Sequence, residues 1–287
     1  MMYRDIRRDR SSFWVRIFEN DDNFIVFLTN KYTYNIIVTC YPALEEVSTR
    51  GWNAKEQNYT VRVSCEKHEK TINDFIQWAE NANKYIWLKT NKNTESYFSN
   101  ELNCCVAVDW NISFEENKRT CVGEAEYYLK YRYPRGDISD KQAENYAHTL
   151  ATSIMECFEY LPISNEENIL VTSLPSYEGL NNLSWNMAKY VCKQVGATLM
   201  EATLFAEKQQ VKGLPFDKKI NMWKSLFDSG SIKFSESVMD KTVLIVDDLY
   251  QSGASMWTYA KYLKSMGANK VIGLVAVKSQ RDSDNNA

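Results

Sequence analysis

The chain has 287 residues, of which 44% are apolar and 25% charged, with 34 basic against 37 acidic side chains. This length suits one large domain or two smaller ones with a real hydrophobic core. With 13% aromatic residues and a net charge of −3, the composition excludes a wholly disordered protein. A pI near 5.6 argues against a broad basic face for duplex DNA, although local basic patches stay open.

The sequence also bears on the compartment in which the protein works. No apolar run reaches the roughly 20 residues that a membrane-spanning helix needs. The first residues, MMYRDIRRDRSSFWVRIF, are basic without a sustained apolar stretch, so no secretory signal is expected. Seven cysteines without regular spacing favour a reducing compartment over a disulfide framework. We therefore expect a cytoplasmic globular protein.

The first part of the chain is rich in short segments typical of β-strands. Each combines β-branched and aromatic residues and is bounded by Asn, Asp, Lys or Glu. One segment, 71–83, has the helical spacing of apolar residues. Residues 1–133 are therefore expected to form a β-rich α+β domain. The sequence does not indicate its role, and docking of a protein partner is one candidate. The expected strands are FIVFLTN (24–30), YNIIVTCY (34–41), YTVRVSC (59–65), KYIWLKT (84–90) and NCCVAVDW (103–110).

The pattern changes near the turn cluster Tyr133-Pro134-Arg135-Gly136, which we take as the boundary to a second domain, residues 134–287. A long amphipathic helix follows, with Ser139 and Gln142 as a capping box and Pro162 as its end. Strands at 169–174, 198–205, 242–246 and 270–277 then alternate with helices at 183–195 and 254–266. Strands that are apolar throughout and joined by helices predict a parallel α/β sheet covered on both faces.

Ligands of such sheets bind at the carboxyl ends of the strands, so chemistry is expected in the loops there. After Val246 the chain continues Asp247-Asp248-Leu249-Tyr250-Gln251-Ser252-Gly253-Ala254-Ser255 and enters a helix. Two carboxylates that leave a buried strand need hydrogen-bond donors or a cation. The free N–H groups of the helix N-terminus favour an anion, which Gly253 lets approach closely. The acidic residues can accept hydrogen bonds from sugar hydroxyls, and the helix N-terminus next to them can bind a phosphate. Together they suit a ribose 5-phosphate.

The segment Val243 to Ser255, VLIVDDLYQSGAS, resembles the thirteen-residue signature of type I phosphoribosyltransferases. In that family the acidic pair holds the ribose hydroxyls of phosphoribosyl pyrophosphate (PRPP), and the next loop wraps the 5-phosphate. The resemblance implies a Rossmann-like phosphoribosyltransferase domain with Asp247 and Asp248 as its catalytic acids. It implies PRPP binding by the loop residues Gln251, Ser252, Gly253, Ala254 and Ser255. Gln251 and Ser252 stand where the family usually has Thr, and Ser255 keeps the hydroxyl of its last Thr.

Further segments resemble the ComF-like branch of competence proteins, over about residues 127–279. Tyr128-Leu129-Lys130-Tyr131 is similar to the branch's Leu-Lys-Tyr element, and residues 170–175 to its Val-Pro-Val-Pro strand and loop. That loop corresponds to the pyrophosphate loop, which implies PRPP binding by Pro175 and Ser176. The branch's N-terminal cysteine zinc ribbon is missing, since the chain has no Cys-x-x-Cys pair, and no metal held by the protein alone is expected.

Phosphoribosyl transfer breaks the bond from ribose C1 to pyrophosphate through an oxocarbenium-like state. Cations must neutralise the leaving group, and water must be excluded. Mg²⁺, bound mainly through PRPP, is the expected cofactor. The stretch 206–225 has the length and the lysines of a lid, with Lys208 and Lys212 as candidates to reach the pyrophosphate and a solvated surface insertion as the alternative.

The expected function is a pentosyl transfer of nucleotide metabolism, in which a glycosyltransferase moves ribose 5-phosphate from PRPP to an unidentified acceptor and releases pyrophosphate. Two alternatives stay open. One is a non-catalytic PRPP or nucleotide sensor, and the other is an effector subunit of a bacterial complex for antiviral defence or DNA handling. A receiver domain also carries an Asp-Asp pair after a strand, but near its N-terminus, whereas this pair lies on a late strand before a phosphate-type turn.

Overall fold

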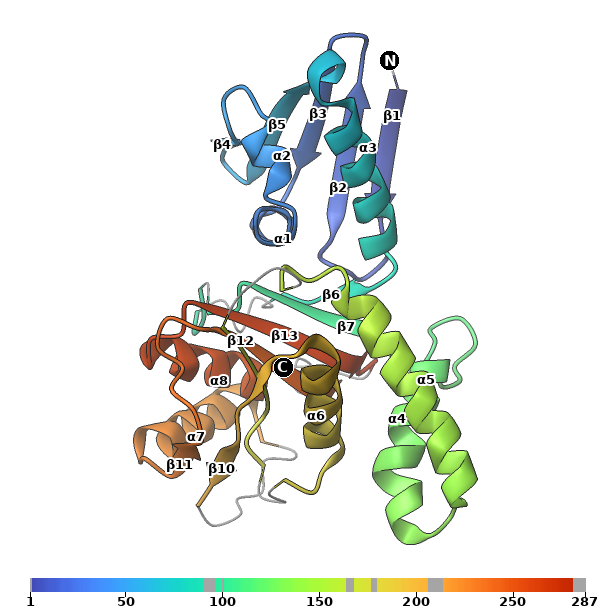
Figure 1. Ribbon diagram of the computed structural model, residues 1–287, viewed down its shortest axis with the longest axis vertical. Coiled ribbons are helices and arrows are strands. Elements are labelled where there is room, and N and C mark those ends of the chain that lie inside the picture. Colours follow the sequence, from blue (N-terminus) through green and yellow to red (C-terminus); the bar gives the residue numbers. More distant parts are fainter. Residues whose placement is uncertain are drawn as a thin grey trace. The chain divides into compact units, whose positions relative to one another are not determined.

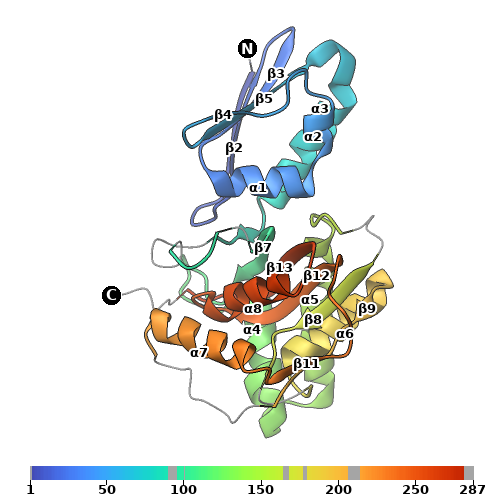
Figure 2. The same cartoon turned by 90° about the vertical axis from the view of Figure 1, so that its left-hand side faces the viewer.

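The computed structural model describes residues 2–89, 96–99, 101–163, 168–176, 180–205 and 214–280. The chain forms two compact units, one of residues 1–89 with 159–162, the other of residues 90–158 with 163–287. Figures 1 and 2 show that each unit combines helices with a sheet. Among the described residues, no helix is both long and apolar enough to cross a bilayer.

The first unit is built on an antiparallel sheet with the strand order β1-β2-β3-β5-β4. Burial alternates along its strands, so that one face packs on the helices of the unit and the other does not. The strands of the sheet are β1 (Met2–Arg7), β2 (Trp14–Glu19), β3 (Asn23–Leu28), β4 (Asn53–Lys55) and β5 (Asn58–Ser64), and the short β6 (Ile86–Trp87) lies outside this sheet. The helices of the unit are α1 (Lys31–Cys40), α2 (Ala43–Glu46) and α3 (Cys65–Ala82).

The prediction of a strand at 34–41 is wrong, because this segment forms most of helix α1. The side-chain oxygen of Asn30 accepts a hydrogen bond of 2.8 Å from the backbone N–H of Thr33, which caps the helix. Thr33, Ile36 and Ile37 are then buried together at steps of three and one, the spacing of a helical face. A good cap and helical burial outweigh the strand preference of β-branched residues.

The other predicted elements of this unit have counterparts in the structure. The segments 24–30 and 59–65 correspond to β3 and β5, and 71–83 corresponds to the part of α3 that follows a break at His68. Only two residues of the predicted strand 84–90 form β6. Next to it, the ring of Tyr85 lies 5.5 Å from the ring of Tyr160, so the short segment 159–162 belongs to this unit.

The second unit contains a parallel sheet in which β7, β13, β12, β8 and β9 lie in that order. Residues 271–277 of β13 are buried without interruption, as expected for a parallel strand covered on both faces. This agrees with the predicted α/β architecture. The strands are β7 (Cys104–Trp110), β8 (Ile169–Ser173), β9 (Thr198–Leu199), β12 (Thr242–Tyr250) and β13 (Lys270–Lys278).

Helices cover both faces of this sheet. Helix α7 packs on α8, while α5 contacts α4 and α6, and Figure 2 shows α7 and α8 on the opposite side of the strands from α6. The predicted capping box at the start of α5 forms, because Gln142 Oε1 accepts a hydrogen bond of 3.0 Å from the N–H of Ser139. The helices are α4 (Cys121–Tyr127), α5 (Asp140–Phe158), α6 (Leu183–Val195), α7 (Phe216–Asp228) and α8 (Ala254–Ser265), with a π-helical turn η1 (Tyr128–Arg132) and a 3₁₀ turn η2 (Tyr133–Arg135).

The expected domain boundary at 133/134 does not coincide with the division between the units. NCCVAVDW forms β7, which pairs in parallel with β13 inside the second unit. The turn at Gly136, with φ of 74°, joins η2 to α5 within that same unit. The predicted strand 198–205 is also divided, into β9 and β10 (Ala202–Leu204), and β10 pairs with β11 (Ile232–Phe234) in a separate antiparallel ribbon.

A chain shortened to residues 126–287 is expected to lose cooperative unfolding. It lacks β7, whose buried residues 104–108 cover one edge of β13, and an exposed apolar edge strand promotes aggregation. Thermal unfolding followed by circular dichroism, together with light scattering, measures this. Residues 96–287, which keep β7, are the control. A monomeric 126–287 chain with a cooperative transition would contradict the structural role of β7.

Candidate functional site

The two acidic residues of the signature lie where the strand order of the parallel sheet reverses. Along the chain β8 is followed by β9 on one side, whereas β12 pairs with the other side of β8. Open parallel sheets bind ligands at the carboxyl ends of the strands at such a point. Pairing of β12 with β8 ends at Val246 opposite Ser173. Asp247 and Asp248, expected in a loop, therefore extend past the end of β8 on a strand that continues to Tyr250.

Ser184 connects the sheet to helix α6 through both acidic residues. Its Oγ donates a hydrogen bond of 3.0 Å to Asp247 Oδ1 and accepts one of 3.2 Å from the backbone N–H of Asp248. Helix α6 begins just before Ser184 because the side chain of Asn182 caps it, accepting a hydrogen bond of 2.9 Å from the N–H of Trp185. Ser184 is buried, so the carboxylate of Asp247 is held in one orientation before any ligand binds.

Lys130, from the π-helical turn η1, forms an ion pair with the second acid. Its Nζ lies 2.7 Å from Asp248 Oδ2, and Asp248 is only 6% exposed. Burial lowers the pKa of the Lys130 ammonium, but the charge of Asp248 and the hydrogen bond to it outweigh burial and hold that pKa above its ordinary value. The lysine therefore stays charged and compensates the buried carboxylate.

Glu126 lies one helical turn before Lys130 and adds a third carboxyl group. Its Oε1 is 3.9 Å from Lys130 Nζ and is buried without a hydrogen-bond partner. Burial, and then the charge of Asp248, raises the pKa of Glu126 to about 7, although Lys130 and Arg119 oppose the rise. Burial and the neighbouring Asp248 also raise the pKa of Asp247. Three carboxyl groups thus share one lysine, which leaves negative charge to be balanced by protons or by a cation.

Gly253 shapes the turn between β12 and α8. It takes the left-handed φ of 82° at the N-cap of α8, and a Cβ atom added to it would overlap the phenol ring of Tyr250. That ring is fixed because Tyr250 Oη lies 3.0 Å from the Trp257 Nε1 that donates a hydrogen bond to it. The sequence suggested that this glycine serves the approach of a phosphate. In the structure its missing side chain makes room for Tyr250.

The turn itself is electropositive. The N-cap residue Gly253 has no side chain. Ser252 Oγ accepts a long hydrogen bond of 3.4 Å from the N–H of Ala254, and the other N–H groups of the first turn together with the helix macrodipole favour an anion. Lys278, at the end of β13, donates a hydrogen bond of 2.6 Å from Nζ to the carbonyl oxygen of Gln251. Ser252 and Ser255 are half-buried around the buried Gly253 and Ala254. An acidic strand end is therefore followed directly by a cationic turn.

The remaining predicted site residues lie in two other places. Pro175 is buried and Ser176 half-buried just after β8, at the carboxyl end of the strand next to β12. Lys208 and Lys212 lie outside the described residues. The described end of the proposed lid stretch is helix α7, in which Lys219 is buried.

Four polar residues of the site were not identified as such from the sequence. Glu126, Ser184 and Lys278 carry no local signal, because each reaches the site from a segment far along the chain. Lys130 had one signal, its place in the Leu-Lys-Tyr element. That element gave no indication of which residue the lysine contacts.

The chain matches no protein-family model and no curated protein. Among solved structures it is similar to two crystal forms of a hypoxanthine phosphoribosyltransferase from Staphylococcus aureus. The orthorhombic form is 10% identical with a TM-score of 0.28, over 56% of this chain and 69% of that one. The tetragonal form is 14% identical with a TM-score of 0.26, over 42% and 59%. Both scores are low, so the assignment of the site rests on the residues of this chain.

Replacement Gly253→Ala is expected to destabilise the protein more than an alanine at another left-handed glycine. A non-glycine residue at positive φ costs roughly 1–3 kcal/mol, and here the overlap with Tyr250 adds to that cost. Gly136→Ala is the matched control, because Gly136 has φ of 74° and nothing within 4 Å of an added Cβ. Urea unfolding measures both free energies, and equal losses would show that Tyr250 does not constrain the turn.

Replacement Glu126→Gln is expected to flatten the dependence of stability on pH. The carboxyl of Glu126 ionises near 4.5 when unfolded and near 7 when folded, so between these values the folded chain holds a proton that the unfolded chain has lost. The parent therefore loses stability relative to the variant as pH rises from 5 to 7, by about 2 kcal/mol.

Urea unfolding of both proteins at several pH values measures this difference. Glu144→Gln, on the exposed side of α5, controls for the loss of one acidic group. Parallel profiles for the parent and Glu126→Gln would contradict the assigned environment of Glu126.

Proposed function

We propose that the second unit binds PRPP and that the chain is a phosphoribosyltransferase-like protein, which transfers ribose 5-phosphate to an acceptor and releases pyrophosphate. The observation that carries this proposal is the division of charge along β12 and α8. Carboxylates stand at the end of the strand, and Lys278 with the helix N-terminus stands after it. Ribose 5-phosphate has hydroxyl groups at one end and a dianion at the other, which suits this division.

The acidic end is suited to the ribose hydroxyls. Ionised carboxylates accept strong hydrogen bonds from hydroxyl groups. Ser184 and Lys130 hold the two carboxylates through contacts of 3.0 Å and 2.7 Å, and such preorganisation supplies much of the electrostatic stabilisation in enzymes. Asp247 is more exposed than Asp248, so we assign it the closer contact with the sugar and give Asp248 the role of holding the local charge balance.

Magnesium is part of the proposal. Mg²⁺ is commonly held by one or two carboxylates together with substrate phosphates, and Asp247 and Asp248 can supply two carboxylates beside a site with excess negative charge. When bound with PRPP, the ion would neutralise pyrophosphate oxygens as the leaving group departs. We assign pyrophosphate binding to Pro175 and Ser176, and we assign Lys208 and Lys212 the role of cations that close over it.

We extend the proposal to the ComF-like branch. Its support is the Leu-Lys-Tyr element, since Lys130 of that element is the residue that pairs with Asp248 of the signature. The lysine of an element that resembles this branch thus contacts an acid of the signature that the whole family shares, and this contact supports the extension.

A non-catalytic role is the second candidate. In it, the second unit senses PRPP or a nucleotide, and the chain is an effector subunit of a bacterial defence or DNA-handling complex. The first unit favours this candidate, because it carries a pocket of its own lined by Arg50 and Arg62, which pentosyl transfer does not require. Release of pyrophosphate from PRPP in the presence of nucleobases would separate catalysis from sensing.

Replacement Asp247→Asn together with Asp248→Asn is expected to weaken PRPP binding at least about 100-fold. Hydrogen bonds to charged groups contribute roughly 1.5–3 kcal/mol each, and the variant loses the sugar contact of Asp247 together with the carboxylate that Asp248 offers to Mg²⁺. Calorimetric titration with PRPP, with and without Mg²⁺, measures the affinity, and circular dichroism checks the fold. Asp247→Asn alone is a second variant that keeps the ion pair of Lys130.

The control is Glu144→Gln with Glu156→Gln on the exposed side of α5, which removes two charges from the same unit. Unchanged affinity in both asparagine variants would contradict the site assignment. Absence of PRPP binding by the parent, with and without Mg²⁺, would contradict the proposed function itself.

A further inference from the structure

The sheet of the first unit has one face that its helices do not cover. Val15 and Ile17 of β2 and Val61 and Val63 of β5 are buried on the helical side, and α1, α2 and α3 all contact β3 or β5. Figure 2 shows these helices together on one side of the strands. The strand residues that alternate with the buried ones form the other side, which we call the open face.

Aromatic side chains lie on the open face along β1, β2 and β3. Tyr3 lies opposite Phe18 in the strand register, and their rings are 5.1 Å apart. Phe27 belongs to the neighbouring cross-strand row. Tyr3 is 52% exposed, and Trp14 is half-buried. Planar rings on an accessible sheet face are platforms on which the bases of an unpaired strand stack.

Arginines are interleaved with these rings. The guanidinium carbons of Arg7 and Arg16 lie 4.6 Å and 4.2 Å from the ring centre of Trp14. Arg16 Nε is buried without a hydrogen-bond partner. Asp5, which accepts a hydrogen bond of 2.6 Å from Trp14 Nε1, is the one carboxylate among the described strand residues of the open face.

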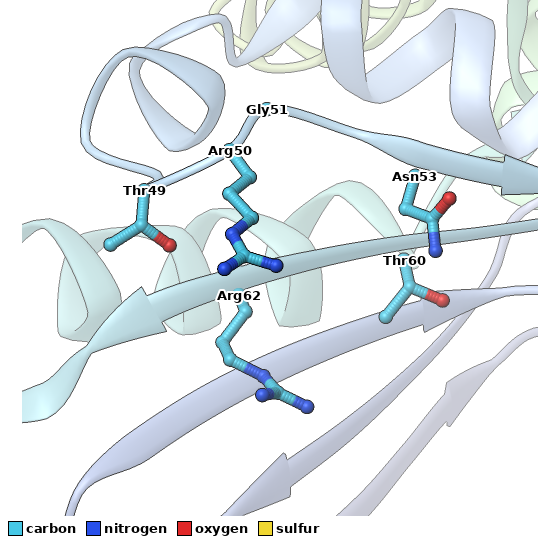
Figure 3. Close-up of a pocket in the computed structure, with 6 residues that line it drawn as sticks. All are labelled: Thr49, Arg50, Gly51, Asn53, Thr60 and Arg62. Carbon is cyan, nitrogen blue, oxygen red and sulfur yellow. The ribbon is translucent and has the colours of Figure 1, made fainter.

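A pocket of about 400 Å³ lies at the β4 and β5 side of this face. Figure 3 shows Arg50 reaching it from the loop before β4 and Arg62 from β5, with Asn53 and Thr60 beside them. Arg62 pairs with Ile25 and Thr60 pairs with Phe27 across β3 and β5, so these two pocket residues lie on the open face. Among the residues that the structure describes, no ion pair joins Arg50 or Arg62 to a carboxylate.

We propose that the open face binds single-stranded nucleic acid, with a backbone phosphate held by Arg50 and Arg62 and with bases stacked on the rings of Tyr3, Phe18 and Phe27. Arginine forks match phosphate oxygens, and the excess of cations over the single Asp5 gives the complementary charge. An acidic peptide would satisfy the guanidinium groups but would leave the rings without planar partners. Five strands span about 19 Å, and sheet faces of this size stack two or three bases.

The test is fluorescence anisotropy of labelled 12-residue RNA and DNA strands with the full chain over a range of salt concentrations. Arg50→Gln with Arg62→Gln is expected to weaken binding at least tenfold and to reduce the salt slope by about 0.7, since the phosphate that the two arginines hold is no longer neutralised. Tyr3→Ala is expected to weaken it at least fivefold through lost stacking. The RNA and DNA arms distinguish the two kinds of strand.

Two matched controls are expected to stay within twofold of the parent. Lys67→Gln with Lys70→Gln removes two exposed cations from α3, on the helical side of the same unit. Tyr190→Ala removes a ring that is 38% exposed in the second unit. Circular dichroism checks that the variants stay folded.

Several outcomes would overturn the proposal. They are no binding of either strand, equal losses in the arginine variant and in the lysine control, or displacement by a mononucleotide as effective as by a strand. Weak binding of both strands together with tight binding of an acidic peptide would assign the face to a protein partner instead. Asp247→Asn should bind strands as the parent does, which separates this face from the PRPP site.

Discussion

The ion pair between Lys130 and Asp248 is the interaction on which the candidate site depends. A carboxylate that is 6% exposed costs several kcal/mol unless a cation compensates it. Lys130 supplies that cation from a π-helical turn, an irregularity that is frequent at functional sites. With Asp248 compensated, Asp247 can remain just beyond the carboxyl end of β8, where it accepts a hydrogen bond from Ser184. The same lysine is shared with Glu126, so the protonation of Glu126 is coupled to the acidic pair.

Much of the second unit could be predicted from the sequence because its signals are local. Helix α6 runs from Leu183 to Val195 as expected, since Asn182 caps its start and Gly196, with φ of 66°, ends it. The strands of the parallel sheet are continuous apolar runs, which few other structures require. The acidic pair and the glycine turn were found for the same reason, as they lie within one short stretch of chain.

What the sequence did not reveal depends on contacts between distant segments. The uninterrupted burial of residues 104–108 marks β7 as a strand of the parallel sheet, whereas β3 and β5 alternate. The sequence does not separate β7 from β3, because Cys104 to Val108 and Phe24 to Leu28 are both continuous apolar runs. No local pattern indicates that Ser184 reaches Asp247 or that Lys278 reaches Gln251. For the segment 34–41, the cap at Asn30 was the informative residue and the β-branched composition was misleading.

The contact between Tyr85 and Tyr160 has a consequence for how this protein can have been assembled and can be taken apart. The first unit is discontinuous, because residues 159–162 return to it after the chain has entered the second unit. A gene fragment that ends at Lys89 would encode its sheet and helices but would leave Tyr85 without its partner ring. The first unit therefore cannot be exchanged as one continuous piece of gene. Recombination that transfers it intact must also carry the coding sequence for residues 90–158 of the second unit.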